Sequence, residues 1–461
     1  MTHATPTDAT LVSMTARSDH GSTDRSIIWF RRDLRLADHP ALHHAARDGR
    51  EVVPVFVIDP ALVGPSGAAR LAFMYRSLRS LNEAMDGALV VRHGRPETVI
   101  PQLAREAGAT EVVVSRDYAP YGRRRDAAVI EQLRSMDVDL VGKGSPYVVP
   151  PGTVLKDNGT PYAVFTPFSR AWGAKPHADP LAVPDVRWVR PSIDHDEIPA
   201  DPALDCELPE ASEDAAHRLW DEFRDGHVEQ YSARRNAPAE PGTSRLSPYL
   251  RWGQIHPRQL LAELGDTKGE STFRDELAWR EFYADVLFHH PDSARENLQA
   301  KMDVLPVDSD AAAQQRFDRW AAGRTGYPIV DAGMRQLLAT GWMHNRVRMI
   351  TASFLVKDLH LPWQWGARHF MRHLVDGDIA SNQHGWQWTA GTGTDAAPFF
   401  RVFNPILQSE RFDPHGDYIR QWVPELAHIV GKALHGPVEA MVEHGAERTE
   451  ALRRYQVVTG R

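Results

Sequence analysis

The 461-residue chain contains one cysteine, Cys206, and therefore cannot form an internal disulfide. Proteins of the reducing cytosol generally lack disulfides, so the composition favours a cytoplasmic protein. No apolar run approaches the roughly 18 residues of a membrane-spanning helix, and we expect no membrane association. The formal net charge is −8, so overall charge does not indicate nucleic-acid binding, which would need a local basic patch.

Residues 1–24 lack the apolar segment of a secretory signal, and their acidic residues argue against a transit peptide. We expect a disordered N-terminal tail, with Met14 as an alternative start. The length indicates two or more domains, and no internal repeat stands out.

Short runs rich in β-branched residues alternate with helical patterns over residues 25–145. The runs are SIIWF (26–30), VVPVFVI (52–58), ALVVRHG (88–94) and EVVVSRD (111–117). This alternation predicts a doubly wound, Rossmann-like parallel sheet with helices on both faces. Ligands of such sheets bind at the carboxyl ends of the strands, where segments 31–38, 58–60 and 116–126 are expected.

Residues 146–210 are dense in Pro, Gly and Asp and predict a long interdomain linker whose first part is ordered. Over residues 211–461 helical periodicity replaces the strand patterns, and most Trp and His residues occur here. We therefore predict an α/β domain joined to an all-α domain.

Residues 342–401 concentrate side chains that suit a binding cavity. On a helix Asn345, Arg348 and Met349 are spaced i, i+3 and i+4, so they face one way. An amide, a cation and a thioether on one face suit a pocket wall better than a packed core. The glycine-rich run 385–393 lets backbone approach a flat ligand closely. We interpret the region as the wall of a cofactor and substrate cavity.

Residues 243–247 precede a helix for which Ser247 is the expected N-cap and Pro248 the first-turn residue. The hydroxyls of Thr243 and Ser244, backbone N–H groups and Arg245 suit a pyrophosphate there. An ordinary capped helix is the alternative interpretation of this segment alone.

A helix is predicted over residues 273–290, with Glu276, Trp279, Arg280 and Tyr283 on one stripe. A carboxylate beside a tryptophan within a helix is costly unless it has a partner. A pair of Glu276 with Arg280 at i, i+4 is the structural interpretation. Substrate recognition is the functional one.

Four sequence words occur in the order typical of one family. They are TGYPIVDAGMRQL (from residue 325), WMHNRVRMI (342–350), DGDIASNQHGWQW (376–388) and TGTDAAPFFRVFNP (392–405). From about residue 26 to about 426 the chain resembles the DNA photolyase/cryptochrome family, and most closely its class I cyclobutane pyrimidine dimer photolyases. The resemblance implies an antenna-binding α/β domain and a helical domain that binds FAD.

The resemblance assigns FAD contacts along the helical domain. They are Tyr231, Thr243, Ser244, Arg245, Leu246, Ser247, Phe273, Arg280, Asn345, Arg348, Asp376, Asp378 and Asn382. In this assignment Asp376 pairs with Arg348, Asp378 bonds the edge of the flavin ring, and Asn382 lies at flavin N5. Asparagine at that last position is typical of photolyases, whereas plant cryptochromes have aspartate and animal ones cysteine.

The resemblance also implies a pocket for a flipped pyrimidine dimer. Glu276 would bond its carbonyl edge, Trp279 and Trp388 would flank it, and Met349 would contact it, with Asn345 close by. Backbone-binding positions of the DNA correspond to Arg346, Arg401 and Arg411, and less clearly to Arg235.

Trp386 and Trp363 match the first two members of the family's electron-transfer chain. The segment of the third member, LPVDSDAAAQQ (305–315), contains no tryptophan. Either photoreduction is impaired, or another aromatic residue, Trp320 or Trp342, takes its place.

The expected antenna contacts are Arg32, Asp59, Arg70 and Asp117, with a surface ion pair or loop cap as the alternative for each. DYAPYGRRRD (117–126) is closer to the deazaflavin-binding members of the family, although Ala119 replaces an acidic residue typical of them. We therefore expect 8-hydroxy-5-deazaflavin as the second chromophore, with methenyltetrahydrofolate as the alternative.

Together these features predict a monomeric, metal-free repair enzyme that uses light and reduced FAD to split cyclobutane pyrimidine dimers in DNA. A cryptochrome-like photoreceptor is the alternative, but only about 35 residues follow the last family word, QWVPEL (421–426). A third hypothesis, a flavoprotein that performs redox chemistry in the dark, does not explain the dimer-pocket residues. The sequence also lacks a nicotinamide-binding fingerprint.

Overall fold

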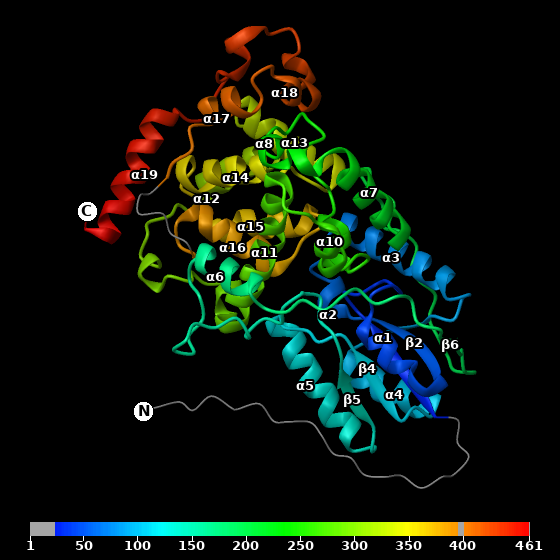
Figure 1. Cartoon of the computed structure of the whole chain (residues 1–461). Helices are drawn as coiled ribbons and strands as arrows, with labels where there is room; N and C mark the ends of the chain where they lie inside the picture. The colour runs from blue at the N-terminus through cyan, green and yellow to red at the C-terminus, as the bar shows by residue number, and fades with distance from the viewer. Residues whose placement is uncertain (1–23, 395–400, 461) are drawn as a thin grey trace, which may run out of the picture.

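The computed structural model describes residues 24–394 and 401–460, which form an α/β domain beside a helical domain (Figure 1). The sheet strands are β1 (Arg25–Phe30), β2 (Glu51–Ile58), β3 (Val90–His93), β4 (Glu111–Val114) and β5 (Asp139–Gly142). Their order is β3-β2-β1-β4-β5, and all neighbours are parallel. The predicted doubly wound sheet is confirmed.

The two faces of the sheet belong to different cores, because alternate side chains of a strand point in opposite directions. Ile28 and Phe30 of β1 pack with α1 and α3, whereas Ile27 and Trp29 pack with α4 and α5. The helices of this domain are α1 (Pro40–Ala45), α2 (Pro60–Val63), α3 (Ala68–Ala84), α4 (Pro96–Ala107) and α5 (Pro120–Arg134). Helices thus cover both faces, as is usual for parallel sheets.

The connection between the domains contains two regular elements, α6 (Phe165–Gly173) and β6 (Arg187–Trp188). β6 pairs in parallel with β2, which the Pro-rich composition of this segment did not predict. Near its start the connection is bonded to the helical domain. There Glu281 accepts hydrogen bonds from the backbone N–H groups of Val148 and Val149.

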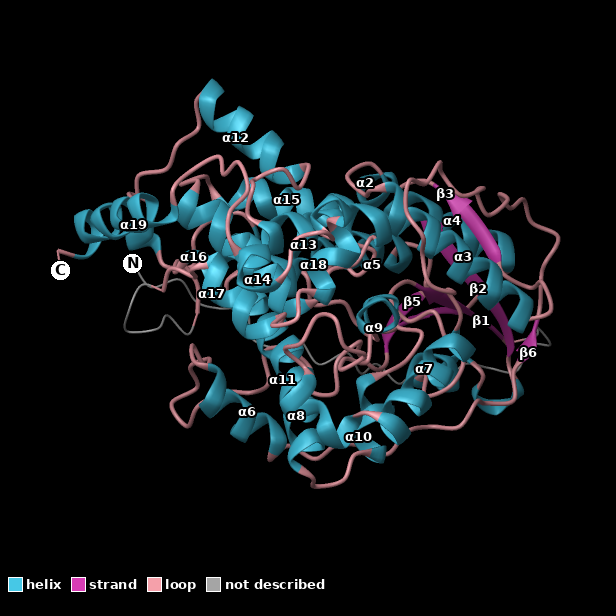
Figure 2. Ribbon diagram, turned by 90° about the horizontal axis from the view of Figure 1, so that it is seen from above, coloured by secondary structure: helices cyan, strands magenta, loops and turns pink. Residues whose placement is uncertain are grey.

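The helical domain lies to one side of the sheet, as the view from above shows (Figure 2). Its helices are α7 (Glu213–Gly226), α8 (Tyr231–Arg234), α9 (Ser247–Trp252), α10 (Pro257–Glu263), α11 (Lys268–His289), α12 (Ala311–Ala321), α13 (Pro328–Thr340), α14 (Asn345–Ser353), α15 (Trp363–His373), α16 (Ile379–Ala390), α17 (Pro405–Phe412), α18 (Asp417–Trp422) and α19 (His444–Thr459). No helix of the described ranges is long and apolar enough to span a membrane.

Two helix starts differ from the sequence predictions. α11 begins at Lys268 rather than at residue 273, because Thr267 and Glu270 form a reciprocal capping box. Ser247 was predicted as the N-cap of α9, and this is wrong: Leu246 is the cap residue and Ser247 the first helical residue. The Ser247 hydroxyl instead accepts a hydrogen bond from Nε1 of Trp342 at 3.2 Å.

The core of the helical domain places α15 tightly against α16. Trp386 of α16 is buried and packs at the position of Gly366 in α15. A Cβ atom at residue 366 would lie 2.1 Å from the indole, so only glycine permits this approach. α14 continues directly into a π-helical turn, Phe354–Asp358.

Candidate functional site

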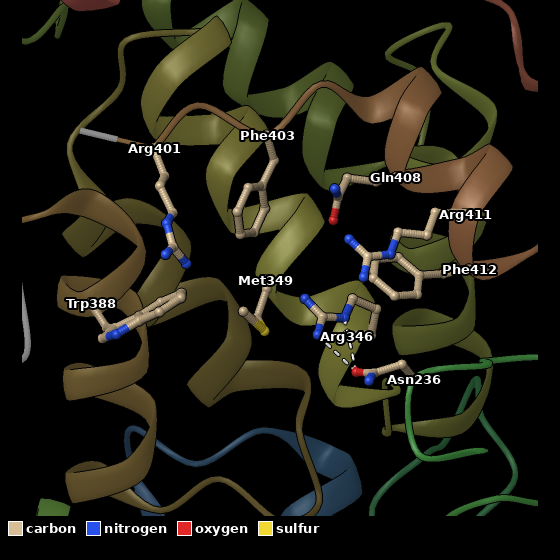
Figure 3. Close-up of a pocket in the computed structure, with 9 residues that line it drawn as sticks. All are labelled: Asn236, Arg346, Met349, Trp388, Arg401, Phe403, Gln408, Arg411 and Phe412. Carbon is tan, nitrogen blue, oxygen red and sulfur yellow. Dashed lines mark hydrogen bonds between the residues drawn. The ribbon is translucent and has the colours of Figure 1, made fainter. Parts of the chain in front are cut away.

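A cavity of about 380 Å³ is lined by residues of α14, α16, α17 and neighbouring segments (Figure 3). Its lining residues are Asn236, Arg346, Met349, Trp388, Arg401, Phe403, Gln408, Arg411 and Phe412. Among the predicted site residues, the structure brings together Arg346, Met349, Trp388, Arg401 and Arg411. The sequence analysis missed the other four. Phe403, Gln408 and Phe412 follow Arg401 closely, and that proximity was the available signal.

The wall of this cavity is positively charged. Arg346, Arg401 and Arg411 line it, and none of its lining residues is acidic. Nε and Nη2 of Arg346 donate to the side-chain oxygen of Asn236 at 3.1 and 2.8 Å. The guanidinium carbons of Arg346 and Arg411 lie 4.4 and 5.1 Å from the ring centre of Phe412. Such a wall suits an anion that carries flat apolar groups.

Glu276 and Trp279 lie on α11 and are not among the lining residues of the cavity. Glu276 forms an ion pair with Arg235. Burial raises the pKa of Glu276, while Arg235 and the cavity residue Arg346 limit the rise. Trp279 is stacked on Phe165 of α6, with ring centroids 3.7 Å apart. Glu276 is therefore close enough to the cavity to be affected by the charge of Arg346, but neither Glu276 nor Trp279 lines the cavity.

The ion pair expected between Arg348 and Asp376 is present, with Nη2 of Arg348 2.7 Å from Oδ2. Asp376 is buried, and its Oδ1 has no hydrogen-bond partner among the described residues. Asn345, the first residue of α14, is exposed. Asn382 of α16 donates through Nδ2 to the carbonyl oxygen of Ala367 at 3.1 Å. Their role as cofactor contacts stays a prediction.

Asp378 caps α16 and pairs with Arg32 of the α/β domain, Nη2 to Oδ2, at 2.6 Å. Burial alone would raise the pKa of Asp378, but Arg32, Arg251 and Arg280 hold it well below its usual range. Arg280, an expected FAD contact, donates to the carbonyl oxygens of Pro146 and Leu250 at 2.9 and 3.1 Å. Asp378 thus joins the two domains, whereas Arg280 joins the start of the connection to the helical domain.

A cluster of arginines lies at the domain boundary around residues 376–378, with Arg70 buried and Arg32 and Arg251 half-buried. Burial lowers the pKa of Arg70 to about 10 and that of Arg251 to about 9. Nε of Arg251 donates to the carbonyl oxygen of Gly377 at 2.9 Å, but Nη1 of Arg251 and Nε of Arg32 are buried without partners in the described chain. The sequence analysis did not predict Arg251 as a site residue. The available signal was its position shortly after the predicted anion-binding segment 243–247.

The remaining antenna candidates lie at the carboxyl edge of the sheet. Asp59 accepts hydrogen bonds from the backbone N–H of Ala61 and from the hydroxyl of Tyr121. Asp117 pairs with Arg125 at 3.3 Å. The charge of Asp378 and, less strongly, that of Asp117 raise the pKa of Arg32 against the effect of its burial. Asp117 therefore lies near the arginine cluster.

The segment 243–247 is held in a strained turn, since Arg245 has a positive φ of 51°. The Arg245 guanidinium lies 5.2 Å from the ring centre of Trp342. Phe273, an expected cofactor contact, is enclosed by aromatic rings, with Tyr231 at 5.4 Å and Trp220 at 5.6 Å between centroids. Phe273 therefore packs behind Tyr231 in the core of the domain.

The tryptophans expected to carry electrons are buried in the helical core. Nε1 of Trp363 donates to Oδ1 of Asn297 at 2.8 Å. Trp320 lies edge-on to Trp386, with centroids 6.1 Å apart. Trp342 instead contacts Arg245 and Ser247. Of the two candidates left open by the sequence, Trp320 is the one in contact with Trp386.

Two family models match the chain: "DNA photolyase" over residues 26–185 and "FAD binding domain of DNA photolyase" over residues 273–457. A relative named deoxyribodipyrimidine photo-lyase, from Agrobacterium fabrum, is 39% identical, and the match covers 94% of this chain and 98% of the relative.

Two solved structures resemble nearly all of the chain. A bacterial class III photolyase from Agrobacterium tumefaciens has a TM-score of 0.88 and 35% identity, covering 97% of this chain and 100% of that one. A cryptochrome from Synechocystis has a TM-score of 0.86 and 28% identity, covering 95% and 100%.

Proposed function

The chain belongs to the DNA photolyase family, and on this premise we propose that it is a light-dependent DNA-repair enzyme, a deoxyribodipyrimidine photo-lyase that splits cyclobutane pyrimidine dimers. The observation that supports the proposal is the arginine-lined cavity of Figure 3. Its three arginines suit DNA phosphates, while Trp388 and Met349 offer apolar contact to two joined pyrimidine bases that have left the stack.

The residues around 376–378 fit FAD. The unpartnered, buried Oδ1 of Asp376 is an acceptor for a ring N–H, and Arg348 holds the other oxygen in place. Thr243, Ser244 and Arg245 offer donors for the diphosphate. The ring would be held by Asn345, Asp376, Asp378 and Asn382. Reduced FAD, when bound and excited by blue or near-ultraviolet light, supplies the electron that opens the dimer.

The protein's own part in the reaction is to orient the dimer and exclude water. Burial favours the protonated form of Glu276, which can donate a hydrogen bond to a pyrimidine carbonyl oxygen once its ion pair with Arg235 opens. Trp279 and Trp388 would face the two sides of the dimer. Charge that develops on the carbonyl oxygen is then stabilised by a fixed donor.

We propose that the antenna chromophore is 8-hydroxy-5-deazaflavin, held at the domain boundary by Arg32, Arg70 and Asp117 together with Arg251. The buried, unpartnered nitrogen atoms of Arg32 and Arg251 support an anionic ligand there. Reconstitution of the purified protein with this deazaflavin or with methenyltetrahydrofolate, followed by absorbance of the retained chromophore, tests the choice. Replacing Arg251 by Leu should abolish retention of the deazaflavin while FAD stays bound.

The experiment for the main proposal is repair of a thymine-dimer oligonucleotide by the purified protein with dithionite-reduced FAD, lit against dark. Light-dependent restoration of thymines is expected. Tight flavin binding without repair would favour the photoreceptor alternative, which the likeness to a cryptochrome structure keeps in view. Membership of class I, the cytoplasmic location and the monomeric state stay predictions.

A further inference from the structure

Arg346 is held in the cavity wall entirely by neutral groups. One edge of its guanidinium donates two hydrogen bonds to Oδ1 of Asn236, at 3.1 and 2.8 Å. Its face lies on the ring of Phe412, 4.4 Å from the ring centre. In Figure 3 the amide of Asn236 reaches Arg346 from the side opposite Phe403 and Arg401.

The charge of Arg346 is therefore not neutralised by an ion pair. The charged groups that face it are Arg235, Arg411 and Glu276. Two of these are cations, and Glu276 is already paired with Arg235. Among the described residues, no carboxylate forms an ion pair with Arg346, Arg401 or Arg411. Repulsion by the neighbouring cations makes the position of Arg346 unfavourable for the stability of the fold. A purely structural role therefore explains Arg346 poorly.

An aspartate at position 236 would hold the guanidinium more strongly, because opposite charges attract in addition to the two hydrogen bonds. It would also cancel the charge. The amide oxygen fixes the direction of the guanidinium and leaves the charge available to a ligand. The ring of Phe412 also holds the guanidinium without removing its charge, since a ring face attracts a cation but does not neutralise it.

We infer that Asn236 is a positioning residue for DNA binding: it holds Arg346 in place while leaving its full positive charge for a phosphodiester group of the lesion-bearing strand. The inference rests on the proposed function, because it takes the cavity to be the DNA site. It assigns to Asn236 a role in affinity and in salt dependence, with no part in electron transfer.

Three variants separate position from charge. Asn236→Asp keeps an acceptor at the same place but neutralises Arg346. Asn236→Ala removes the acceptor and leaves the charge. Asn158→Asp is the matched control, because Asn158 is an exposed turn residue whose Oδ1 accepts from Thr160, which aspartate does equally well. The control changes net charge by the same amount away from the cavity wall.

The measurement is the dissociation constant of the FAD-loaded proteins for a dimer-containing oligonucleotide in the dark, at several salt concentrations. Asn236→Asp should weaken binding and reduce the slope of log K against log salt by about one, as for loss of one phosphate contact. Asn236→Ala should weaken binding about threefold to tenfold with the wild-type slope.

A wild-type slope in Asn236→Asp, or the same loss of slope in Asn158→Asp, would overturn the inference. If Asn236→Asp fails to retain FAD, the double-mutant cycle of Asn236→Ala with Arg346→Gln decides, since additive losses would show that the two residues act independently. Failure of the wild-type protein to bind or repair the dimer would refute the proposed function instead. If the wild-type protein repairs the dimer and the Asn236 variants bind DNA with wild-type affinity and salt dependence, only the role of Asn236 is refuted.

Discussion

The ring of Phe165 in α6 lies flat against the indole of Trp279 in α11, with centroids 3.7 Å apart and planes 7° from parallel. Phe165 belongs to the connection between the domains, and Trp279 to the helix that carries Glu276. A second bond, from Nε1 of Trp172 to Glu281 at 2.6 Å, joins the same two helices. The connection therefore packs against the helix that carries the predicted dimer-recognition residues.

Replacing Phe165 by Leu should weaken binding of the dimer oligonucleotide, because Trp279 loses the ring that fixes its orientation. The stacked pair contributes about 0.5–1.5 kcal/mol beyond burial. Binding and thermal unfolding of the FAD-loaded protein check this. Phe165→Tyr keeps the ring and should restore binding.

Phe168→Leu is the control for this prediction, since Phe168 lies in the same helix and contacts Phe282 rather than Trp279. It should lower stability without a matching loss of DNA affinity. Equal losses of affinity in the Phe165 and Phe168 variants would contradict the positioning role.

Replacing Gly366 by Ala should lower the free energy of unfolding by about 1–3 kcal/mol, because the added methyl group overlaps the Trp386 indole. Gly385 of α16 has open space around its Cβ position. Gly385→Ala should therefore be neutral or stabilising by about 0.5–1 kcal/mol. Chemical denaturation of the two variants makes the comparison, and a tolerated Gly366→Ala would show that α15 and α16 can separate.

Replacing Trp320 by Phe should remove most of the photoreduction of oxidised FAD, because Trp320 is the tryptophan in contact with Trp386. Repair by protein reduced beforehand with dithionite should not change. The measurement is flavin absorbance during illumination with an external reductant. Trp188→Phe, in β6 of the α/β domain, serves as the control, and undiminished photoreduction in Trp320→Phe would favour a route through Trp363 alone.

The free energy of unfolding should fall as pH rises from about 4.5 to 7, because Glu281 loses its proton over this range. Burial raises its pKa from 4.5 to about 7, despite three N–H groups that favour the ionised form. The unfolded chain loses this proton first as pH rises, so the folded state loses up to about 3 kcal/mol relative to it.

Glu281→Gln should abolish that component of the pH dependence, whereas Glu83→Gln, at an exposed position of α3, should keep it. Free energies of unfolding at pH 5 and pH 8 provide the test. Equal pH dependence in the wild type and in Glu281→Gln would mean that Glu281 is ionised throughout.

Several features follow from the sequence because they depend on local order. β-branched runs between helical patterns specify the parallel sheet, and the helical spacing of Asn345, Arg348 and Met349 specifies α14, although of these three only Met349 lines the cavity. The pair of Arg348 with Asp376 follows from the family's words. Side chains whose neighbours lie within one or two helical turns, or within the family's sequence words, were therefore predictable.

Tertiary structure decided the contacts between distant segments. Composition indicates that 146–210 is a connection, but only packing shows that Phe165 stacks on Trp279 and that β6 extends the sheet. Asp378 was expected to face the cofactor, yet its charge is met by Arg32 of the other domain. Asn236 lies 110 positions from Arg346 and has no local signal, because a hydrogen bond between two loops or helices depends on how the domain folds and not on periodicity.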